Sequence, residues 1–204
     1  MADGSVMATF FDENREYVPL DKISPVMRQA QIAIEDNRFY SHGAIDLRGT
    51  MRALVSNMGG ASTQGGSTLT QQYVKQARIE MAVSAGDEEG VRSAQEQTVS
   101  RKLQELRYAI ALEHDLSKDQ ILERYLNIAY YGDGAYGVEA AAKHYFGVTA
   151  DKLDLGQAAM LAGLVQNPVS YDPVNNPEAA ITRRNVVLTR MKSLGLVLSL
   201  IHIS

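Results

Sequence analysis

The chain has 204 residues, of which 45% are hydrophobic and 22% are charged, and its formal net charge is −4 at pH 7. This length suits one globular domain, and the composition excludes a chain that is disordered throughout. The negative net charge disfavours general nucleic-acid binding, and the absence of cysteine excludes disulfides, thiolate-bound zinc and cysteine nucleophiles.

No segment of the sequence predicts a membrane anchor or an export signal. The longest apolar stretch, residues 194–203, is about half of the roughly 20 residues that a membrane-spanning helix needs. The first residues lack the basic start and the apolar run of a signal peptide. We therefore expect either a cytosolic protein or a piece of a larger chain.

Helical periodicity dominates the chain after a short extended start. Residues 9–20 alternate loosely between apolar and polar side chains, which predicts a short strand or hairpin. Beyond them, apolar residues recur three and four positions apart, as they do in amphipathic helices. The expected helices span residues 23–34, 45–58, 68–81, 94–113, 118–128, 138–146, 155–165 and 177–194. Residues 57–66 and 85–95 contain glycines that interrupt this pattern, and they are expected to be mobile. The overall expectation is a mainly α fold.

Sequence signals mark several helix boundaries. At three helix starts, a capping residue is followed three positions later by a glutamine, which fits a capping box. The pairs are Thr68 with Gln71, Ser117 with Gln120, and Asp154 with Gln157. Gly195 follows the last expected helix, as the preference for glycine at helix C-termini predicts.

The first candidate site lies at the end of the first expected helix. Glu35 and Asp36 are adjacent carboxylates, and Phe39 and His42 follow them closely. A carboxyl group flanked by apolar side chains and by a like charge has a raised pKa, which suits a general base. The alternative is a solvated helix end with a hydrogen-bonded, structural His42.

A glycine-rich loop runs directly into a helix at residues 65–72, GGSTLTQQ. Such a junction presents free backbone N–H groups and the positive end of the helix dipole, which attract phosphate and other anions. Lys75 lies on the same side of this helix as Gln71 and Gln72, where it can face the same anion. The loop lacks the Lys-Ser/Thr pair of a P-loop, so nucleotide hydrolysis is disfavoured. The alternative is a flexible loop followed by an ordinary helix cap.

The third candidate site is the charged cluster of Arg101, Lys102 and Glu105. Their spacing of three and four residues makes them neighbours on one helix. The buried stripe of this helix is expected on another face, at Val99, Leu103, Leu106 and Ile110. The alternative is a solvated surface ion pair that contributes little to stability.

These segments, in this order, resemble the motifs of the family 51 glycosyltransferases. This family comprises the peptidoglycan-polymerising domain of class A penicillin-binding proteins and the monofunctional transglycosylases. The similarity covers residues 18–194. The matching segments are IEDNRFYSH (34–42), GGSTLTQQYVKQ (65–76), RKLQE (101–105), ILERYLNIAYYGDGAYGVEAAAKHYFG (121–147), AAMLAGLVQNPVSYDP (158–173) and RRNVVLTRM (183–191).

The chain departs from the family pattern at a few positions. Ala44 stands where the family commonly has glycine, and Gln166 stands where some members carry a lysine near the substrate diphosphate. Residues 197–204 resemble nothing in the family, and the sequence lacks the membrane anchor that usually precedes the domain. We expect an excised catalytic domain with a truncated or non-native tail.

The resemblance implies a lysozyme-like, two-lobed helical domain with a short N-terminal strand or hairpin. It divides the chain into a strand and linker segment at residues 1–22, a glycosyltransferase domain at residues 23–195 and a tail at residues 196–204.

The resemblance also implies a reaction. Family members polymerise lipid II, a disaccharide-pentapeptide on undecaprenyl diphosphate, with inversion at the anomeric carbon of the donor. Glu35 matches the general base that deprotonates the 4-hydroxyl of the acceptor GlcNAc, and Glu105 matches a second family glutamate. We assign Glu105 to orienting Arg101 and Lys102 or to binding a divalent ion. No cofactor is required, and a magnesium or manganese ion at the diphosphate is compatible with this reaction.

The same resemblance assigns the substrate contacts. Lys75, Arg101 and Lys102 match the cations around the donor diphosphate. The other residues expected to bind substrate or to shape its site are Asp36, Phe39, His42, Ser67, Thr68, Gln71, Gln72, Asn127 and Tyr130. Residues 57–66 and 82–95 are expected to act as lids over the site.

The implied partners are lipid II, the growing glycan chain and the bacterial membrane surface. A fused transpeptidase domain and divisome or elongasome proteins are further candidates, and no nucleic acid is expected. The implied location is the outer face of the bacterial cytoplasmic membrane. Two other functions stay open: a lysozyme-like muramidase or lytic transglycosylase, and a non-catalytic helical module that binds cell-wall precursors. The two cationic segments favour transfer over cleavage, because cleavage needs no diphosphate site.

Overall fold

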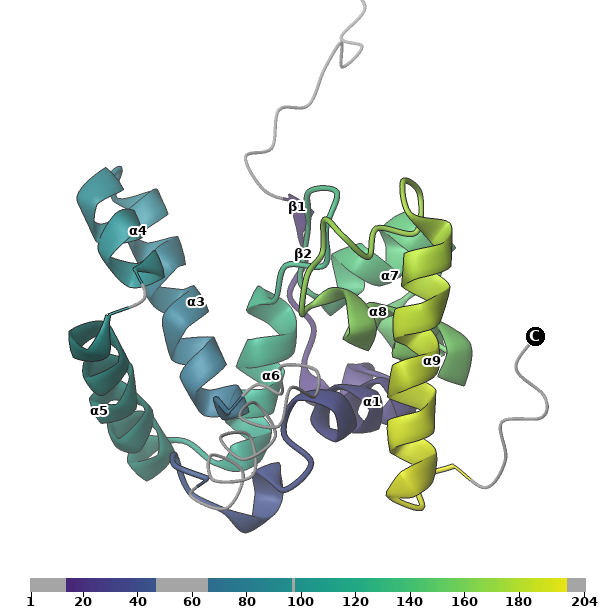
Figure 1. Ribbon diagram of the computed structural model, residues 1–204, viewed down its shortest axis with the longest axis horizontal. Coiled ribbons are helices and arrows are strands. Elements are labelled where there is room, and N and C mark those ends of the chain that lie inside the picture. The colour runs from purple at the N-terminus through teal and green to yellow at the C-terminus, as the bar shows by residue number, and fades with distance from the viewer. Residues whose placement is uncertain (1–13, 47–65, 97, 198–204) are drawn as a thin grey trace, which may run out of the picture.

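The computed structural model describes residues 14–46, 66–96 and 98–197, and this part of the chain is mostly helical (Figure 1). The α-helices are α1 (Pro25–Glu35), α3 (Leu69–Ser84), α4 (Glu88–Gln95), α5 (Val99–Asp115), α6 (Lys118–Ile128), α7 (Val138–Phe146), α8 (Leu155–Leu164) and α9 (Pro177–Ser193). Two-residue strands are β1 (Asn14–Arg15) and β2 (Ala135–Tyr136), and short 3-10 helices are η1 (Leu20–Lys22), η2 (Phe39–Ser41) and η3 (Ala150–Lys152). The mainly helical fold with a short N-terminal strand is therefore confirmed.

The helices form two lobes with α6 between them (Figure 1). Helices α1, α7, α8 and α9 pack together as the large lobe, and α3 packs against α4 and α5 as the small lobe. Helix α6 contacts α3 on one side and α7 on the other, so it joins the lobes.

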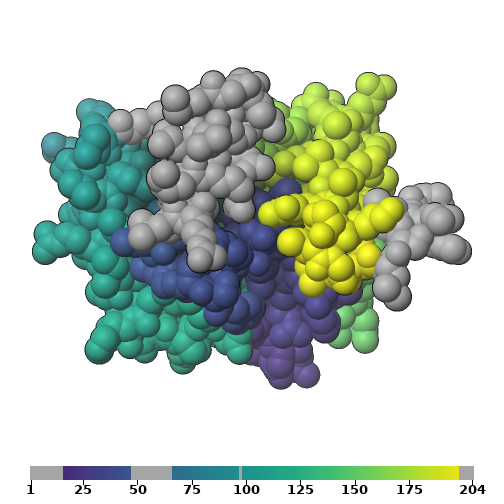
Figure 2. Space-filling model, turned by 60° about the horizontal axis from the view of Figure 1, so that its bottom comes forward, coloured from purple at the N-terminus to yellow at the C-terminus, as the bar shows by residue number. Residues whose placement is uncertain are grey.

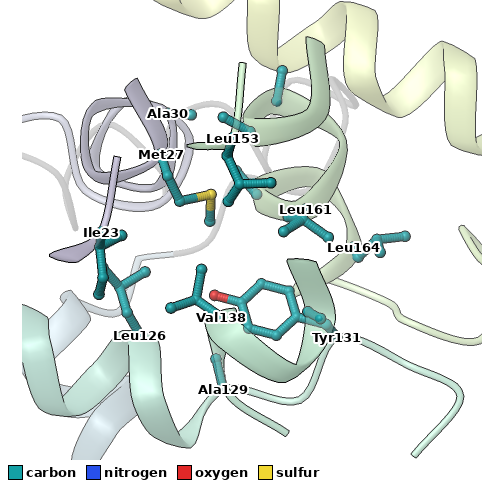
Figure 3. Close-up of a cluster of buried hydrophobic side chains, with 14 of the residues drawn as sticks. Ile23, Met27, Ala30, Leu126, Ala129, Tyr131, Val138, Leu153, Leu161 and Leu164 are labelled. Atoms are coloured by element: carbon teal, nitrogen blue, oxygen red, sulfur yellow. The ribbon is translucent and has the colours of Figure 1, made fainter. Parts of the chain in front are cut away.

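A continuous apolar core fills the large lobe and reaches α6 (Figure 3). Met27 and Ala30 of α1, Leu126 of α6 and Leu161 of α8 all belong to it, and none exposes any surface. Burying one such leucine contributes about 1.5–3 kcal/mol. The apolar positions recur three and four residues apart along each helix, which is why the sequence pattern located these helices.

The N-terminal strand pairs with a segment far along the chain. Strand β1 runs parallel to β2, so the strand is confirmed but its partner is not a sequence neighbour as in a hairpin. The next residues are held by side chains of α6. Asn127 accepts a hydrogen bond from the Val18 amide (2.9 Å) and donates one to the Val18 carbonyl (2.8 Å), while Glu123 accepts one from the Leu20 amide (2.7 Å).

Two of the three expected capping boxes are complete. Ser117 with Gln120 and Asp154 with Gln157 form the reciprocal pair of hydrogen bonds that defines the box. At the third position Thr68 accepts from the Gln71 amide, but the Gln71 side chain donates to the Ala44 carbonyl instead.

One expectation about local structure needs correction, and two others lie mostly outside the described residues. Residues 88–95, expected to be part of a mobile loop, form helix α4, because Asp87 accepts a hydrogen bond from the Gly90 amide and caps it (2.8 Å). Most of the expected helix 45–58 and of the expected lid 57–66 lies outside the described residues.

The expected buried stripe of α5 is wrong at three of its four positions, and only Leu106 is partly buried. Val99, Leu103 and Ile110 are 78%, 58% and 51% exposed, whereas Glu105 and Ala109 are buried. The inversion is possible because two cations four and three residues before Glu105 compensate its charge. The charged Glu105 can therefore lie with Ala109 on the covered face of α5, while Val99, Leu103 and Ile110 face outward.

Gly137, between β2 and α7, offers a test of backbone packing. Its φ is +83°, and a Cβ atom there would lie 2.8 Å from the carbonyl oxygen of Asn127. Gly147 also has a positive φ (+66°) but has open space around its Cα. We expect Gly137→Ala to lower the free energy of unfolding by more than about 3 kcal/mol and Gly147→Ala by about 1 kcal/mol, in urea denaturation. Equal losses would show that the contact with Asn127 relaxes freely.

Candidate active site

Glu35, the last residue of α1, meets the first turn of α3. The Nε2 atom of Gln72 donates a hydrogen bond to Glu35 Oε2 (2.9 Å). Although part of the residue is exposed, burial is the main cause that raises the pKa of the Glu35 carboxyl above its ordinary value of 4.5. The Gln72 hydrogen bond and the charge of Arg183 act in the opposite direction, and Asp36 reinforces the rise. A carboxylate of this kind is suited to accept a proton near neutral pH.

Asp36 joins the end of α1 to the start of α3. Its Oδ1 atom lies 2.6 Å from Nε2 of His42, and its Oδ2 atom accepts a hydrogen bond from the Leu69 amide (3.1 Å). That amide is one of the free N–H groups of the first turn, where a carboxylate is favourable. In Figure 2, the blue surface that includes residues 36–46 lies between the teal small lobe and α9 in yellow. The hydrogen bond between Asp36 and the Leu69 amide thus keeps Gln72, three residues after Leu69, beside Glu35.

Thr68 and Gln71 hold the segment that follows His42. Both side chains donate to the carbonyl oxygen of Ala44, Thr68 at 3.2 Å and Gln71 at 2.8 Å. Ala44 is not among the residues with positive φ, so alanine replaces the family glycine there without backbone strain. The two residues expected to contact substrate thus also fix the loop beside the site.

A cationic cluster lies next to the start of α3. Lys102 donates to Ser67 Oγ (2.7 Å) and pairs with Glu105 (3.1 Å), and Arg101 pairs with the other oxygen of Glu105. The Glu105 side chain is 2% exposed, whereas that of Lys102 is 44% exposed. Lys75, three residues after Gln72 on α3, is partly buried. Lys102, with Arg101 beside Glu105, places positive charge next to a helix N-terminus, an arrangement that favours an anionic ligand.

Three of the expected substrate residues make their contacts elsewhere. Phe39 is fully buried, and the Lys118 ammonium lies 4.6 Å from its ring centroid. Asn127 is buried, and its amide holds the Val18 backbone. Tyr130 stacks against Tyr136, with ring centroids 4.6 Å apart. These contacts account for each residue structurally, and their expected roles in substrate binding stay predictions.

Two residues with no role assigned from the sequence lie close to Glu35. The Tyr125 hydroxyl donates to Gln72 Oε1 (3.1 Å), and Arg183 of α9 acts on the Glu35 carboxyl through its charge. Tyr125 was detectable as a polar tip on the apolar face of α6, because a buried tyrosine hydroxyl needs a partner. Arg183 gave no such signal, since arginines are frequent on exposed helix faces.

Two groups of residues bear on whether a divalent ion, compatible with the reaction but not required by it, has a site here. Both oxygens of Glu105 already contact a cation, so the residues present here do not fit a metal site. Asp36, His42 and Asp46 bring one potential ligand atom each within 4.8 Å of one another. However, Asp46 pairs with Arg38, and both oxygens of Asp36 already have partners. Hydrogen bonds and ion pairs thus explain this second group.

Comparison with known proteins gives one consistent result. The family model described as Transglycosylase matches residues 3–192. Penicillin-binding protein 1A/1B of Bacillus subtilis is 43% identical over 197 residues, which are 96% of this chain and 20% of that protein. Penicillin-binding protein 1A of Escherichia coli is 42% identical over 195 residues, 95% of this chain and 21% of that protein. The chain thus spans about a fifth of the length of these curated relatives. By the match along almost its whole length, the chain belongs to the transglycosylase family.

Proposed function

We propose that the chain is a peptidoglycan glycosyltransferase that polymerises lipid II into glycan strands. The 4-hydroxyl oxygen of the acceptor GlcNAc attacks the anomeric carbon of the donor. The bond from that carbon to the undecaprenyl diphosphate breaks, and its electron pair leaves with the diphosphate. Attack opposite the leaving group inverts the anomeric centre. The family match and the relatives' names support this reaction class.

Glu35 is the base of this reaction. A sugar hydroxyl is a weak nucleophile until a base takes its proton during attack. The observation that carries the assignment is the Glu35 carboxylate, which has a raised pKa and is fixed in place by Gln72 at the start of the anion-attracting helix. The same carboxyl can release its proton to solvent after transfer, so one base serves repeated cycles.

The cationic cluster binds the donor diphosphate. Negative charge grows on this leaving group as its bond to the sugar breaks, and fixed cations stabilise the charge without reorganising. Lys75, Arg101 and Lys102 supply these cations, and the amides at the start of α3 add hydrogen-bond donors. Glu105 orients Arg101 and Lys102. Because the leaving group is already a stable anion, no second general acid is needed.

A hydrolytic enzyme is the strongest competitor. A lysozyme-like muramidase or lytic transglycosylase also places one glutamate in a helical site, but its substrate carries no diphosphate. The Lys102 ammonium, half-exposed beside Ser67 at a helix start, favours transfer. A non-catalytic binding module would bind the same substrate without using Glu35 as a base.

The deciding experiment offers the purified chain two substrates in parallel. We expect long glycan products on a gel from lipid II and no fragments from preformed, lipid-free glycan. Fragments from the glycan would indicate a hydrolase or lytic enzyme. Saturable binding of lipid II without any product would indicate a binding module.

The membrane surface is a proposed partner of the small lobe. Within residues 14–46, 66–96 and 98–197, no helix combines the length and apolar character needed to cross a membrane. Exposed apolar side chains do occur on both α3 and α5, at Met81, Val83, Val99, Leu103 and Ile110. Such side chains can contact the lipid tail of the substrate or the bilayer that holds it. The proposed location, the outer face of the cytoplasmic membrane, is supported by the relatives, which are penicillin-binding proteins.

Further partners are proposed from the relatives alone. Their names describe penicillin-binding proteins, which supports a transpeptidase domain fused to this one and contacts with divisome or elongasome proteins. The division into residues 1–22, 23–195 and 196–204 also stays a prediction.

A further inference from the structure

A chain of hydrogen bonds runs from the core of the protein to the Glu35 carboxylate. Gln31 Nε2 donates to the Tyr125 hydroxyl at a long 3.5 Å, and that hydroxyl donates to Gln72 Oε1 (3.1 Å). Gln72 Nε2 then donates to Glu35 Oε2 (2.9 Å). The three partners come from α1, α6 and α3, and every donor points toward Glu35.

The direction of this chain follows from chemistry. An ionised carboxylate can only accept hydrogen bonds, so Glu35 requires the NH₂ side of the Gln72 amide. The opposite side of that amide is an acceptor, and it meets the Tyr125 hydroxyl. Because the Gln31 amide nitrogen already donates to this hydroxyl, the hydroxyl hydrogen is free to point at Gln72.

We propose that Tyr125 is a positioning residue for the base: its hydroxyl fixes the orientation of the Gln72 amide and thereby the placement of the Glu35 carboxylate. This inference rests on the proposed function and deepens it. Tyr125 has no exposed surface and does not reach the substrate directly. It acts through Gln72.

Orientation matters because the two ends of a glutamine amide have nearly the same shape and opposite polarity. Without the Tyr125 hydroxyl, the carbonyl oxygen of Gln72 loses its donor, and the amide can shift out of the position in which its NH₂ group meets the carboxylate. Glu35 then loses its hydrogen bond and moves. A displacement of about 1 Å at a reacting group costs up to about 100-fold in rate.

Several other groups influence Glu35, and the two that lie outside the hydrogen-bond chain, Asp36 and Arg183, are kept constant in the test. Asp36 follows it in the chain and raises its pKa, and Arg183 of α9 lowers it. From α3, Gln72 lowers the pKa by its hydrogen bond, and from α6, Tyr125 lies within electrostatic range. Loss of the Gln72 hydrogen bond therefore moves the pKa of Glu35 upward.

The test removes the hydroxyl with Tyr125→Phe, which keeps the buried ring. We expect kcat with lipid II to fall by about 10-fold, while KM stays within about twofold because no substrate contact is lost. The acid limb of the kcat/KM profile should move to higher pH. A titration of the Glu35 carboxyl by ¹³C NMR should show the same upward shift without any substrate.

Tyr131→Phe is the matched control. Tyr131 is also fully buried, and within the described residues its hydroxyl has no hydrogen-bond partner. Figure 3 shows this hydroxyl pointing toward Val138 inside the apolar core. The control therefore deletes the same atom from the same core and removes no hydrogen bond of the chain to Glu35. It should leave kcat and the NMR titration as in the parent.

A double-variant cycle shows whether Tyr125 acts through Gln72. Gln72→Met removes the amide and keeps similar length, so adding Tyr125→Phe to it should change the Glu35 titration and kcat little further. Additive effects would overturn the proposal, as would a Tyr125→Phe protein whose Glu35 titration matches that of Tyr131→Phe. The titration decides even for a chain that makes no polymer, which separates this inference from the proposed reaction.

Discussion

The Glu35→Gln variant should lose polymerisation of lipid II by about 100- to 10,000-fold, the range that general-base catalysis contributes. Glutamine keeps the shape of the side chain and can still accept the hydrogen bond from Gln72, but it cannot take a proton. Polymer yield and single-turnover rates measure the loss. Binding of lipid II should persist, because the cationic cluster is intact.

The same variant should be more stable than the parent at neutral pH. Burial raises the pKa of the Glu35 carboxyl in the folded state, so ionising it costs folding free energy. This cost is present in full above the raised pKa and vanishes below the ordinary value of 4.5. The melting temperature of Glu35→Gln should therefore exceed that of the parent at pH 8 and converge with it as the pH falls toward 4.

In the parent, kcat/KM should fall as the pH drops through the raised pKa of Glu35, since only the ionised form is a base. Glu35→Gln should retain no such acid limb in its residual activity. A variant with near-parent activity would remove Glu35 from the chemistry. A difference in melting temperature that does not change with pH would show that the gain in stability comes from packing and not from the charge.

The sequence predicted the parts of this fold that depend on local signals. The bounds of α6 and α7 match the expectation residue for residue, because Ser117 caps the first helix and glycines flank the second. The pairing of Glu35 with the GGSTLTQQ segment followed from the family resemblance, and the structure brings Gln72 to Glu35. The contact between Glu35 and Gln72 depends on the hydrogen bond from the Leu69 amide to Asp36. These two residues are 33 positions apart, so no local sequence pattern reveals their contact.

The misreading of α5 has a physical cause. Helical periodicity locates the faces of a helix, but it does not say which face is covered. An apolar stripe is normally the buried one, yet here Glu105 is buried and paired with Arg101 and Lys102 while Leu103 is exposed. Charge compensation within the helix was visible in the spacing of RKLQE. What the spacing could not show is that this cluster packs beside Ser67.

Glu105→Gln should weaken catalysis by about 100-fold through the same cluster, within the range measured when a donor to a developing oxyanion is lost. The neutral amide no longer holds Arg101 and Lys102 together, so the cations lose their fixed position around the diphosphate. Both KM and kcat should worsen, because the diphosphate is bound in the ground state and gains charge in the transition state. Steady-state rates over a range of lipid II concentrations measure the two effects.

Stability falls as well, and a second buried glutamate supplies the control. Glu139 lies in the large lobe, away from the cationic cluster of the small lobe. It is buried, pairs with Lys143 four residues later (3.1 Å) and accepts a hydrogen bond from the Ala150 amide (2.7 Å). We expect Glu105→Gln and Glu139→Gln each to lower the melting temperature by several degrees, at about 2–4 °C per kcal/mol for a chain of this size. Only the first should lose polymerisation. Equal activity in the two variants would mean that Glu105 only stabilises the small lobe and that Lys75 binds the diphosphate. Of the proposed cations, Lys75 lies on α3, whereas Arg101 and Lys102 lie on α5 with Glu105.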